Sequence, residues 1–459
     1  MDIKVFHGML ESQPMLRKKS IIQTFYIESL GCPKNSVDSR SMAEMLVVAG
    51  KTEVGDSLDA NLILVNTCGF IRPAVEESVS VLVEFANKKK EDQILIAAGC
   101  LSERIKEDLF AQVPGLDAVF GTRRWADILK MVVQIESGSQ RPFTSFPDAT
   151  RLMEGPSGVL RAASMGGSAY LKIADGCDRG CAFCAIPLIK GPMVSRPLED
   201  ILSDARRLEN QGTQELILIA QDITMYGKDL EMKDGLVHLL SSLVNAVPGI
   251  PWIRLMYTFP GSFPDNFIQL MAEENQILNY LDIPLQHAHP QVLKRMRRPA
   301  NMNQVRNQIS HMRSVIPDLA IRSTFITGFP GETDAEFNTL KKFIEEIRFD
   351  HVGFFPYYHE PDTPAYDLED LPDNVKNERL QVLAALQEKI SLEKNQRLIG
   401  KSMDVLIEGS GDGISVGRSY RDAPEIDGLV ILNEILTAGK ILSVQITGAL
   451  VHDLLAEIT

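Results

Sequence analysis

Three cysteines, Cys177, Cys181 and Cys184, fall within eight residues near the middle of the chain, with the spacing C-x3-C-x2-C. Thiolates this close together can reach one metal centre, and sulfur ligands select zinc or iron–sulfur clusters. A closed zinc site needs four protein ligands, and no fourth cysteine follows nearby. The loop therefore favours a four-iron cluster with one iron left free of protein ligands. A zinc site completed by a distant histidine is the alternative.

The other three cysteines, Cys32, Cys68 and Cys100, each follow an apolar run in the first third of the chain. These runs predict buried strands, and helical patterns lie between them, so residues 21–136 predict a parallel α/β sheet. Because the carboxyl ends of parallel strands share one edge, we expect the three cysteines to meet there and anchor a second cluster. Ordinary buried cysteines are the alternative. The apolar runs are 25–27, 62–65 and 94–98, and the helical patterns cover 39–49 and 75–87.

Residues 168–395 alternate strand and helix patterns on a larger scale. Six such units predict an incomplete TIM-like (β/α)6 barrel, with catalytic groups at the carboxyl ends of its strands. The cysteine loop at 177–184 lies at such an end. The predicted strands are 169–174, 215–220, 252–257, 280–283, 321–326 and 352–355, and the predicted helices include 198–210, 236–245, 304–315 and 334–347.

The remaining segments complete the domain plan. Residues 1–20 read as an N-terminal extension, and residues 137–167, which are rich in Gly, Ser and Pro without periodicity, predict a linker. A charged amphipathic helix near 373–397 precedes short alternating segments with Gly-rich turns. Residues 396–459 therefore predict a small closed β-barrel.

The composition of the chain indicates the class of protein and the compartment in which we expect it. The chain has 459 residues, 44% hydrophobic residues and a formal net charge of −14, which is typical of a globular protein with a sizeable core. The first twenty residues lack the apolar core of a signal peptide, and no run approaches the length of a membrane span. We therefore expect a cytoplasmic protein without membrane contact, in which six reduced cysteines serve metal binding.

The motifs around the central cysteines resemble those of the radical S-adenosylmethionine (SAM) methylthiotransferases. Within that family the chain resembles the branch that modifies ribosomal protein S-twelve, the RimO type, from about residue 24 to its end. The final barrel resembles a TRAM domain. Lys190-Gly191 departs from the pattern, in which an Arg-Gly pair is frequent. The family motifs are 175–177, 183–187 and 195–197, and the branch motifs are 30–35, 220–222, 281–288 and 422–428.

The resemblance implies two 4Fe–4S clusters and SAM as cofactors. The cluster at Cys177, Cys181 and Cys184 would bind SAM, and an auxiliary cluster would be held by the cysteines of the N-terminal domain. The implied reaction is methylthiolation of the β-carbon of an aspartate in S-twelve, giving 3-methylthioaspartate. It requires an electron donor such as a flavodoxin or ferredoxin, and a sulfur donor.

Two other functions stay open. One is methylthiolation of a tRNA adenosine, as in the MiaB type, and the other is a non-catalytic iron–sulfur or zinc scaffold. The predicted C-terminal barrel carries a net charge of −5 over 401–459, which suits a basic protein partner better than RNA. Direct RNA contact is not required for the protein substrate.

Two further segments carry weaker signals. Residues 327–332 are Gly-rich and open a helix, which suggests either a phosphate loop or a tight strand-to-helix turn; the resemblance suggests that they help to seat SAM. The basic run 294–298 is either a solvated helix face or a contact to RNA or an acidic partner.

Overall fold

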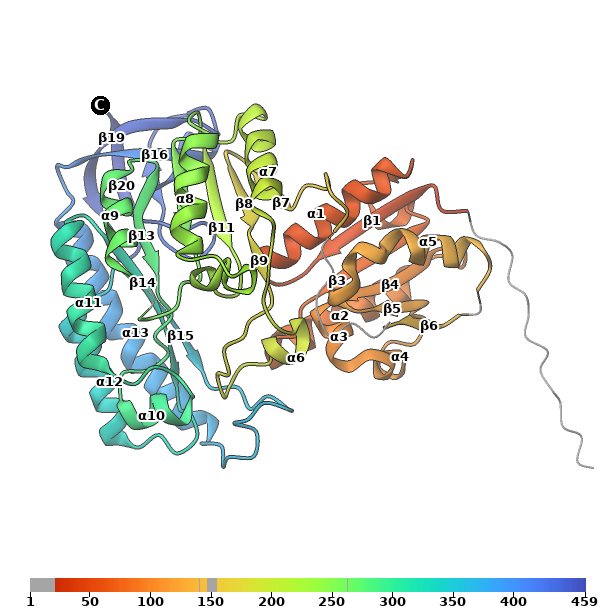
Figure 1. The fold of residues 1–459 in the computed structure, drawn as a ribbon, viewed down its shortest axis with the longest axis horizontal. Coiled ribbons are helices and arrows are strands. Elements are labelled where there is room, and N and C mark those ends of the chain that lie inside the picture. Colours follow the sequence, from red (N-terminus) through yellow and green to blue (C-terminus); the bar gives the residue numbers. More distant parts are fainter. Residues whose placement is uncertain (1–20, 140, 147–154, 262) are drawn as a thin grey trace, which may run out of the picture.

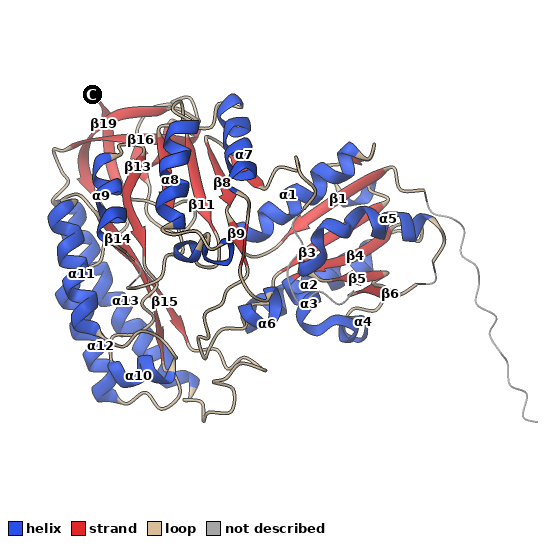
Figure 2. Ribbon diagram, viewed as in Figure 1, coloured by secondary structure: helices blue, strands red, loops and turns tan. Residues whose placement is uncertain are grey.

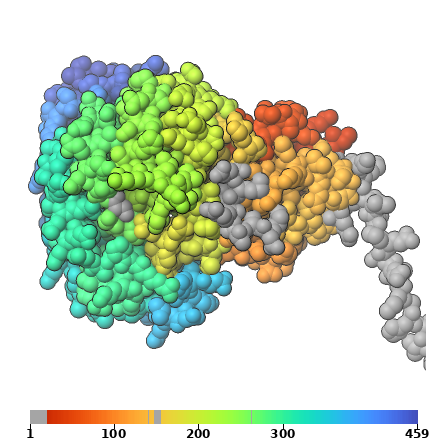
Figure 3. Space-filling model, in the orientation of Figure 1, coloured from red at the N-terminus to blue at the C-terminus, as the bar shows by residue number. Residues whose placement is uncertain are grey.

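The computed structural model describes residues 21–139, 141–146, 155–261 and 263–459. The N-terminal extension expected at 1–20 lies outside the described residues. Among the described helices, none combines the length and apolar character needed to cross a membrane. The chain forms a smaller N-terminal lobe beside a larger body made of the central sheet and the C-terminal barrel (Figure 3).

The N-terminal lobe is a parallel six-stranded sheet with the order β2-β1-β3-β4-β5-β6. Its two central strands, β3 (Leu62–Thr67) and β4 (Ile94–Gly99), are buried at every position, as expected for a parallel sheet covered on both faces. The flanking strands are β1 (Thr24–Ser29), β2 (Thr52–Glu53), β5 (Ala118–Phe120) and β6 (Phe143–Ser145). The helices are α1 (Pro33–Val48), α2 (Arg72–Lys88), α3 (Cys100–Ile105), α4 (Leu109–Gln112) and α5 (Ile128–Glu136).

The central domain is an open sheet of seven strands with the order β15-β14-β13-β12-β11-β8-β7. Six of them run parallel and β7 pairs antiparallel with β8, so the incomplete (β/α)6 barrel predicted from the sequence is confirmed. The strands are β7 (Ala162–Met165), β8 (Ser168–Lys172), β11 (Glu215–Ile219), β12 (Trp252–Leu255), β13 (Ile277–Asp282), β14 (Ala320–Thr327) and β15 (His351–Pro356). Two short strands, β9 (Ala174–Asp175) and β10 (Val194–Ser195), form a separate antiparallel pair.

Helices cover the outer face of this sheet, as Figures 1 and 2 show. Their apolar sides pack on the sheet in one large core. These helices are α7 (Leu198–Asn210), α8 (Gly235–Ala246), α9 (Asp265–Glu273), α10 (Pro290–Arg295), α11 (Met302–Val315), α12 (Asp334–Ile347) and α13 (Asp373–Gln396). The short helix α6 (Ile186–Lys190) lies apart from them, against α3 of the N-terminal lobe.

The two flanking domains share the inner face of the central sheet. Val37 of α1 and Leu406 and Ala423 of the C-terminal barrel belong to the same core as Tyr170, Tyr280 and other inward-facing residues of the sheet. The first helix of the N-terminal lobe is therefore part of the packing inside the half-barrel. This places the start of α1 close to the carboxyl ends of the central strands.

The C-terminal domain is a closed barrel with the order β16-β17-β18-β20-β19, as predicted. Its interior is a small apolar core of its own. The strands are β16 (Ser402–Gly411), β17 (Ile414–Ser419), β18 (Val430–Leu432), β19 (Ile441–Ala449) and β20 (Leu454–Ile458).

The segment expected as a linker, 137–167, contributes strands to both neighbouring sheets. In its described part, β6 extends the N-terminal sheet beside β5, and β7 extends the central sheet beside β8. Both are edge strands of three or four residues, too short to show a period-two pattern in the sequence.

Candidate metal centres

The cysteines of the N-terminal lobe lie at the carboxyl ends of three adjacent strands. Cys32 precedes α1, Cys68 follows β3, and Cys100 opens α3 directly after β4. A methyl group added at Gly31 would lie 2.6 Å from Cys68 Cβ, which shows how closely the first two loops approach. The structure thus brings the three predicted ligands to one edge of the sheet.

Asn35 joins these three loops. Its side-chain amide donates to the carbonyl of Leu30 at 2.9 Å and to that of Thr67 at 3.0 Å, and its Oδ1 accepts from Cys100 Sγ at 3.6 Å. Asn66 in turn donates from Nδ2 to the Asn35 carbonyl. One buried amide therefore fixes the relative positions of the loops that carry the cysteines.

The central cysteines lie in the loop between β9 and α6. Backbone contacts hold the loop from two sides, since Cys177 N donates to Gly191 O at 3.1 Å and Ala182 N donates to Met296 O at 2.9 Å. Arg298 Nη1 lies 3.5 Å from Cys181 Sγ, to which it donates. The Arg298 guanidinium also stacks on the ring of Phe259.

The two sets of cysteines belong to neighbouring loops. Cys100 packs against Ala185, the residue after Cys184, and against Ile189 of α6. The first set lies at the carboxyl edge of the N-terminal sheet and the second set lies in the loop that follows β8 and β9, so the two sets lie on either side of this contact.

A buried ionic cluster joins the lobes beside the cysteines. Asp38 of α1 binds Lys172 of β8 at 2.6 Å and Lys190 of α6 at 3.1 Å. Both lysines also bind Asp175, at 2.8 and 3.4 Å. The departure from the family pattern at Lys190 thus falls on a residue that connects the lobes, and Lys190 Nζ donates at 2.6 Å to Thr122 as well.

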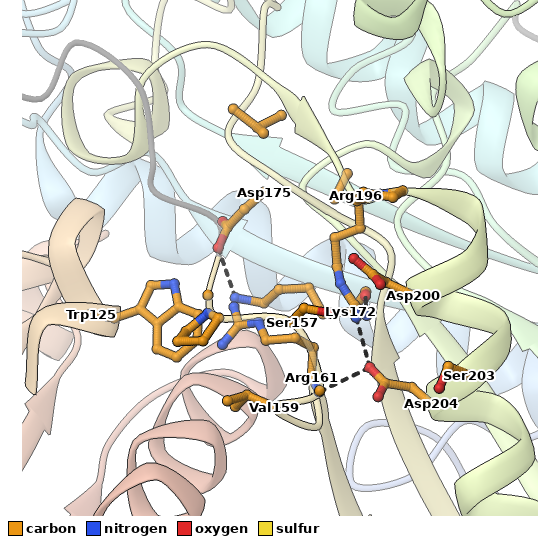
Figure 4. A pocket seen from close by; sticks show the side chains of 16 residues that line it. Trp125, Ser157, Val159, Arg161, Lys172, Asp175, Arg196, Asp200, Ser203 and Asp204 are labelled. Atoms are coloured by element: carbon orange, nitrogen blue, oxygen red, sulfur yellow. Dashed lines mark hydrogen bonds and ion pairs between the residues drawn. The ribbon is translucent and has the colours of Figure 1, made fainter. Parts of the chain in front are cut away.

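A polar pocket opens next to this cluster (Figure 4). Its cations are already paired, since Lys172 binds Asp175 and Arg196 binds Asp204 at 2.7 Å. None of the six cysteines lines the pocket. We therefore do not assign it as the reaction site.

The donor set fits iron–sulfur clusters. All six cysteines are free thiols. Burial raises the pKa of Cys177 to about 11 and the pKa values of Cys100 and Cys184 to about 12, so these sulfurs need a cationic partner to exist as thiolates. In the described part of the chain, no group of three or more His, Cys, Asp or Glu side chains is arranged to hold a single metal ion. A four-iron cluster spreads its thiolates over separate irons and does not require them to converge on one point.

The loop at 327–332 is a tight strand-to-helix turn. Glu332 occupies its centre, where Oε2 accepts from Gly328 N at 3.0 Å and Oε1 binds Arg379 at 2.7 Å. A buried carboxylate in this place disfavours a phosphate as the ligand.

The basic run at 294–298 is partly engaged inside the molecule. Arg295 binds Glu336 at 3.0 Å and Arg298 reaches Cys181. These two cations serve internal contacts, and the RNA or partner contact considered for the run stays a prediction.

The comparisons with known proteins bear on the whole chain. Three family profiles match it: the Radical SAM superfamily over residues 171–344, the uncharacterized protein family UPF0004 over 24–121, and the TRAM domain over 399–459. The chain is 44% identical to the ribosomal protein uS12 methylthiotransferase RimO of Roseiflexus sp. (strain RS-1), with 94% of this chain and 96% of that protein covered. It is also 44% identical to the protein of the same name from Chloroflexus aurantiacus, with 94% and 99% covered.

The chain belongs to the RimO family. Membership makes it a radical SAM methylthiotransferase and implies 4Fe–4S clusters and SAM as its cofactors. The fold agrees with that of the radical SAM methyltransferase TsrM from Kitasatospora setae, solved with cobalamin and a [4Fe-4S] cluster bound. The TM-score is 0.55 at 13% identity, with 86% of this chain and 81% of that chain covered.

Two residues of this RimO-family site were not predicted as functional from the sequence. Asn35 stands in the motif 30–35, but its contacts to three loops depend on tertiary packing. Arg298 was part of the basic run, and nothing local in the sequence connects it with a cysteine 117 residues away.

Proposed function

We propose that this RimO-family protein methylthiolates the β-carbon of an aspartate in ribosomal protein uS12, giving 3-methylthioaspartate. Cys177, Cys181 and Cys184 would hold the SAM-binding cluster, and Cys32, Cys68 and Cys100 would hold the auxiliary cluster. When bound, the reduced cluster and SAM supply a radical strong enough to take hydrogen from an unactivated carbon, chemistry that side chains lack. The observation that carries the proposal is the packing of Cys100 against Ala185, which makes two incomplete ligand sets neighbours.

The protein's residues position and shield this chemistry. Asn35 and Arg298 hold the loops that present the sulfurs, and the ionic cluster around Asp38 fixes one lobe against the other. A rigid junction of this kind favours transfer between groups bound on different domains, because they are held at a fixed separation.

The surface charge of the C-terminal barrel favours a protein substrate over RNA. Two of its four basic residues, Arg418 and Arg421, are buried in ion pairs with Glu215 and Asp350. Lys401 and Lys440 are the exposed cations, against five exposed carboxylates. An acidic barrel repels phosphate and attracts a basic partner such as a ribosomal protein. The exposed carboxylates are Asp404, Asp412, Glu425, Glu434 and Glu457.

The further partners belong to the same proposal. Reductive cleavage of SAM needs an electron donor, such as a flavodoxin or ferredoxin, and each transferred sulfur needs a donor to replace it. A ribosomal substrate and six free thiols support placement in the cytoplasm.

The test is a reaction under anaerobic conditions with the reconstituted protein, SAM, sulfide, a reductant and recombinant uS12. Peptide mass spectrometry should find one methylthio group on one aspartate, together with 5′-deoxyadenosine in solution. The same mixture with unmodified tRNA tests the MiaB-type alternative. A methylthiolated adenosine with unchanged uS12 would contradict the proposal.

A further inference from the structure

Lys34 of α1 is a buried lysine whose ammonium group lies against an aromatic ring. The residue is 9% exposed, and its Nζ lies 3.1 Å from the centroid of the Tyr257 ring. No hydrogen bond or ion pair within the described part of the chain involves this ammonium. A buried charge with only an aromatic face beside it pays a desolvation cost that an anionic partner would offset.

Asp282 and Asp175, the carboxylates that act electrostatically on Lys34, are bound to other groups. Asp282 accepts from Tyr257 N at 3.1 Å and from Arg322 Nη1 at 3.1 Å. Asp175 is held by Lys172, Lys190 and, at 2.8 Å, by Gln221. Within the described residues, these carboxylates are therefore paired with other groups, whereas the ammonium of Lys34 is not paired.

The ammonium lies between the two lobes that carry the predicted cluster ligands. Lys34 is two residues from Cys32, and Tyr257 lies two residues beyond Leu255, the last residue of β12 in the central sheet. Lys34 thus extends from the lobe that carries Cys32 to the carboxyl edge of the central sheet, where Tyr257 lies. Tyr257 has a φ of +62°, an unfavourable conformation for an aromatic residue and one that concentrates at functional sites.

We propose that Lys34 binds the side-chain carboxylate of the aspartate to be modified, a role that rests on the function proposed above. The β-carbon is bonded directly to this carboxylate, so an ion pair with Lys34 fixes the reacting carbon one bond from the anchor. The contact also supplies specificity, because an adenosine base carries no carboxylate. Lys34 is then a positioning residue of the substrate site.

The binding test compares two changes and their combination. Reconstituted Lys34→Met protein and the unsubstituted protein are each titrated with uS12 and with uS12 whose target aspartate is changed to Asn. For the unsubstituted protein, the Asn change should weaken binding roughly 10- to 100-fold, as expected for a hydrogen bond to a charged group. The Lys34→Met protein should bind normal uS12 more weakly by a similar factor. Its affinity should hardly change further when the target aspartate of uS12 is replaced by Asn.

Two controls separate this role from a structural one. Lys88→Met removes an exposed lysine of the same lobe that forms a surface pair with Glu84, and should leave uS12 binding unchanged. Lys34→Met should retain its iron content and should still form 5′-deoxyadenosine from SAM when uS12 is absent.

Three outcomes would overturn the inference in distinguishable ways. If Lys34→Met and the Asn change in uS12 each weaken binding by the same factor whether or not the other is present, Lys34 and the aspartate do not interact. Weaker SAM binding by Lys34→Met, with uS12 binding intact, would assign the ammonium to the carboxylate of SAM. If the unsubstituted protein neither binds nor modifies uS12, the proposed function fails together with this role.

Discussion

At the scale of single residues, the geometry of the N-terminal site depends on an absent side chain at Gly31. This glycine has a φ of +87°, and an added methyl group would lie 2.7 Å from Cys68 Sγ. Gly31→Ala should therefore displace Cys68 and cost about 1–2 kcal/mol in backbone strain alone. We expect loss of the auxiliary cluster, seen by anaerobic EPR as one remaining cluster signal.

Gly50→Ala is the matched control. Gly50 follows the other end of α1 with a φ of +81°, but nothing lies within 4 Å of the added methyl group. Gly50→Ala should introduce the same backbone strain as Gly31→Ala but should keep both clusters. Equal loss of iron in the two variants would show that steric contact with Cys68 is not the cause.

Arg298 should tune the SAM-binding cluster. A guanidinium that donates to Cys181 Sγ stabilises the more negative, reduced state. Arg298→Gln should lower the reduction potential by on the order of 60 mV, about tenfold in the equilibrium of a one-electron couple. An EPR-monitored redox titration measures this shift, with Arg306→Gln, which removes a surface pair to Glu346, as the control. An unchanged reduction potential in Arg298→Gln would show that Arg298 does not influence the SAM-binding cluster.

At the scale of elements, the join between the central sheet and the C-terminal barrel depends on Glu215. This residue of β11 binds Arg254 of β12 and Arg418 of β17, each at 2.6 Å. Burial opposes ionisation of Glu215, yet the two guanidiniums lower its pKa from 4.5 to about 2. Glu215→Gln leaves the buried Arg254 without its carboxylate and Arg418 with Glu408 alone, and should destabilise the protein by about 3–5 kcal/mol.

The ion pairs of Glu215 with Arg254 and Arg418 predict that the stability of the protein depends on pH. Because the pKa of Glu215 is lower in the folded than in the unfolded chain, its contribution is fully present above about pH 4.5 and is lost as the pH falls towards about 2. The stability difference between the unsubstituted protein and Glu215→Gln should narrow over this window. Urea unfolding followed through Trp252, the strand partner of Glu215, measures it. A difference that stays constant down to pH 2 would refute the assignment.

Secondary-structure elements were predicted best where the signal is local. Helices α7 and α12 have the predicted bounds, and α12 begins with a capping box between Thr333 and Glu336. The cysteines at strand ends followed from the apolar runs before them. The contact of Lys34 with Tyr257 and the pairing of Asp38 with Lys172 were not predictable, because they join segments more than a hundred residues apart with no local pattern.

At the scale of the whole molecule, the two lobes are joined by a charge cluster that lies out of solvent. Asp38 faces Lys172, Lys190 and Arg161, the last at 2.6 Å. Asp38→Asn should destabilise the interface by about 3–5 kcal/mol, because the cations lose a counter-ion. Calorimetry should then show the N-terminal lobe unfolding separately from the rest.

An exposed ion pair provides the comparison for Asp38. Glu84→Gln breaks the surface pair with Lys88 and should cost no more than about 1 kcal/mol. If the two variants unfold alike, the interlobe cluster does not stabilise the assembly of the domains.

The proposed reaction depends on two separate clusters, each held by three cysteines. Iron and sulfide per chain should therefore be measured under anaerobic conditions for the unsubstituted protein and for the variant with Cys177→Ala, Cys181→Ala and Cys184→Ala. We predict about eight irons, falling to about four in the variant, as expected for two four-iron clusters with thiolate ligands. Zinc in place of iron, or about four irons that all disappear in the variant, would contradict the presence of two separate clusters.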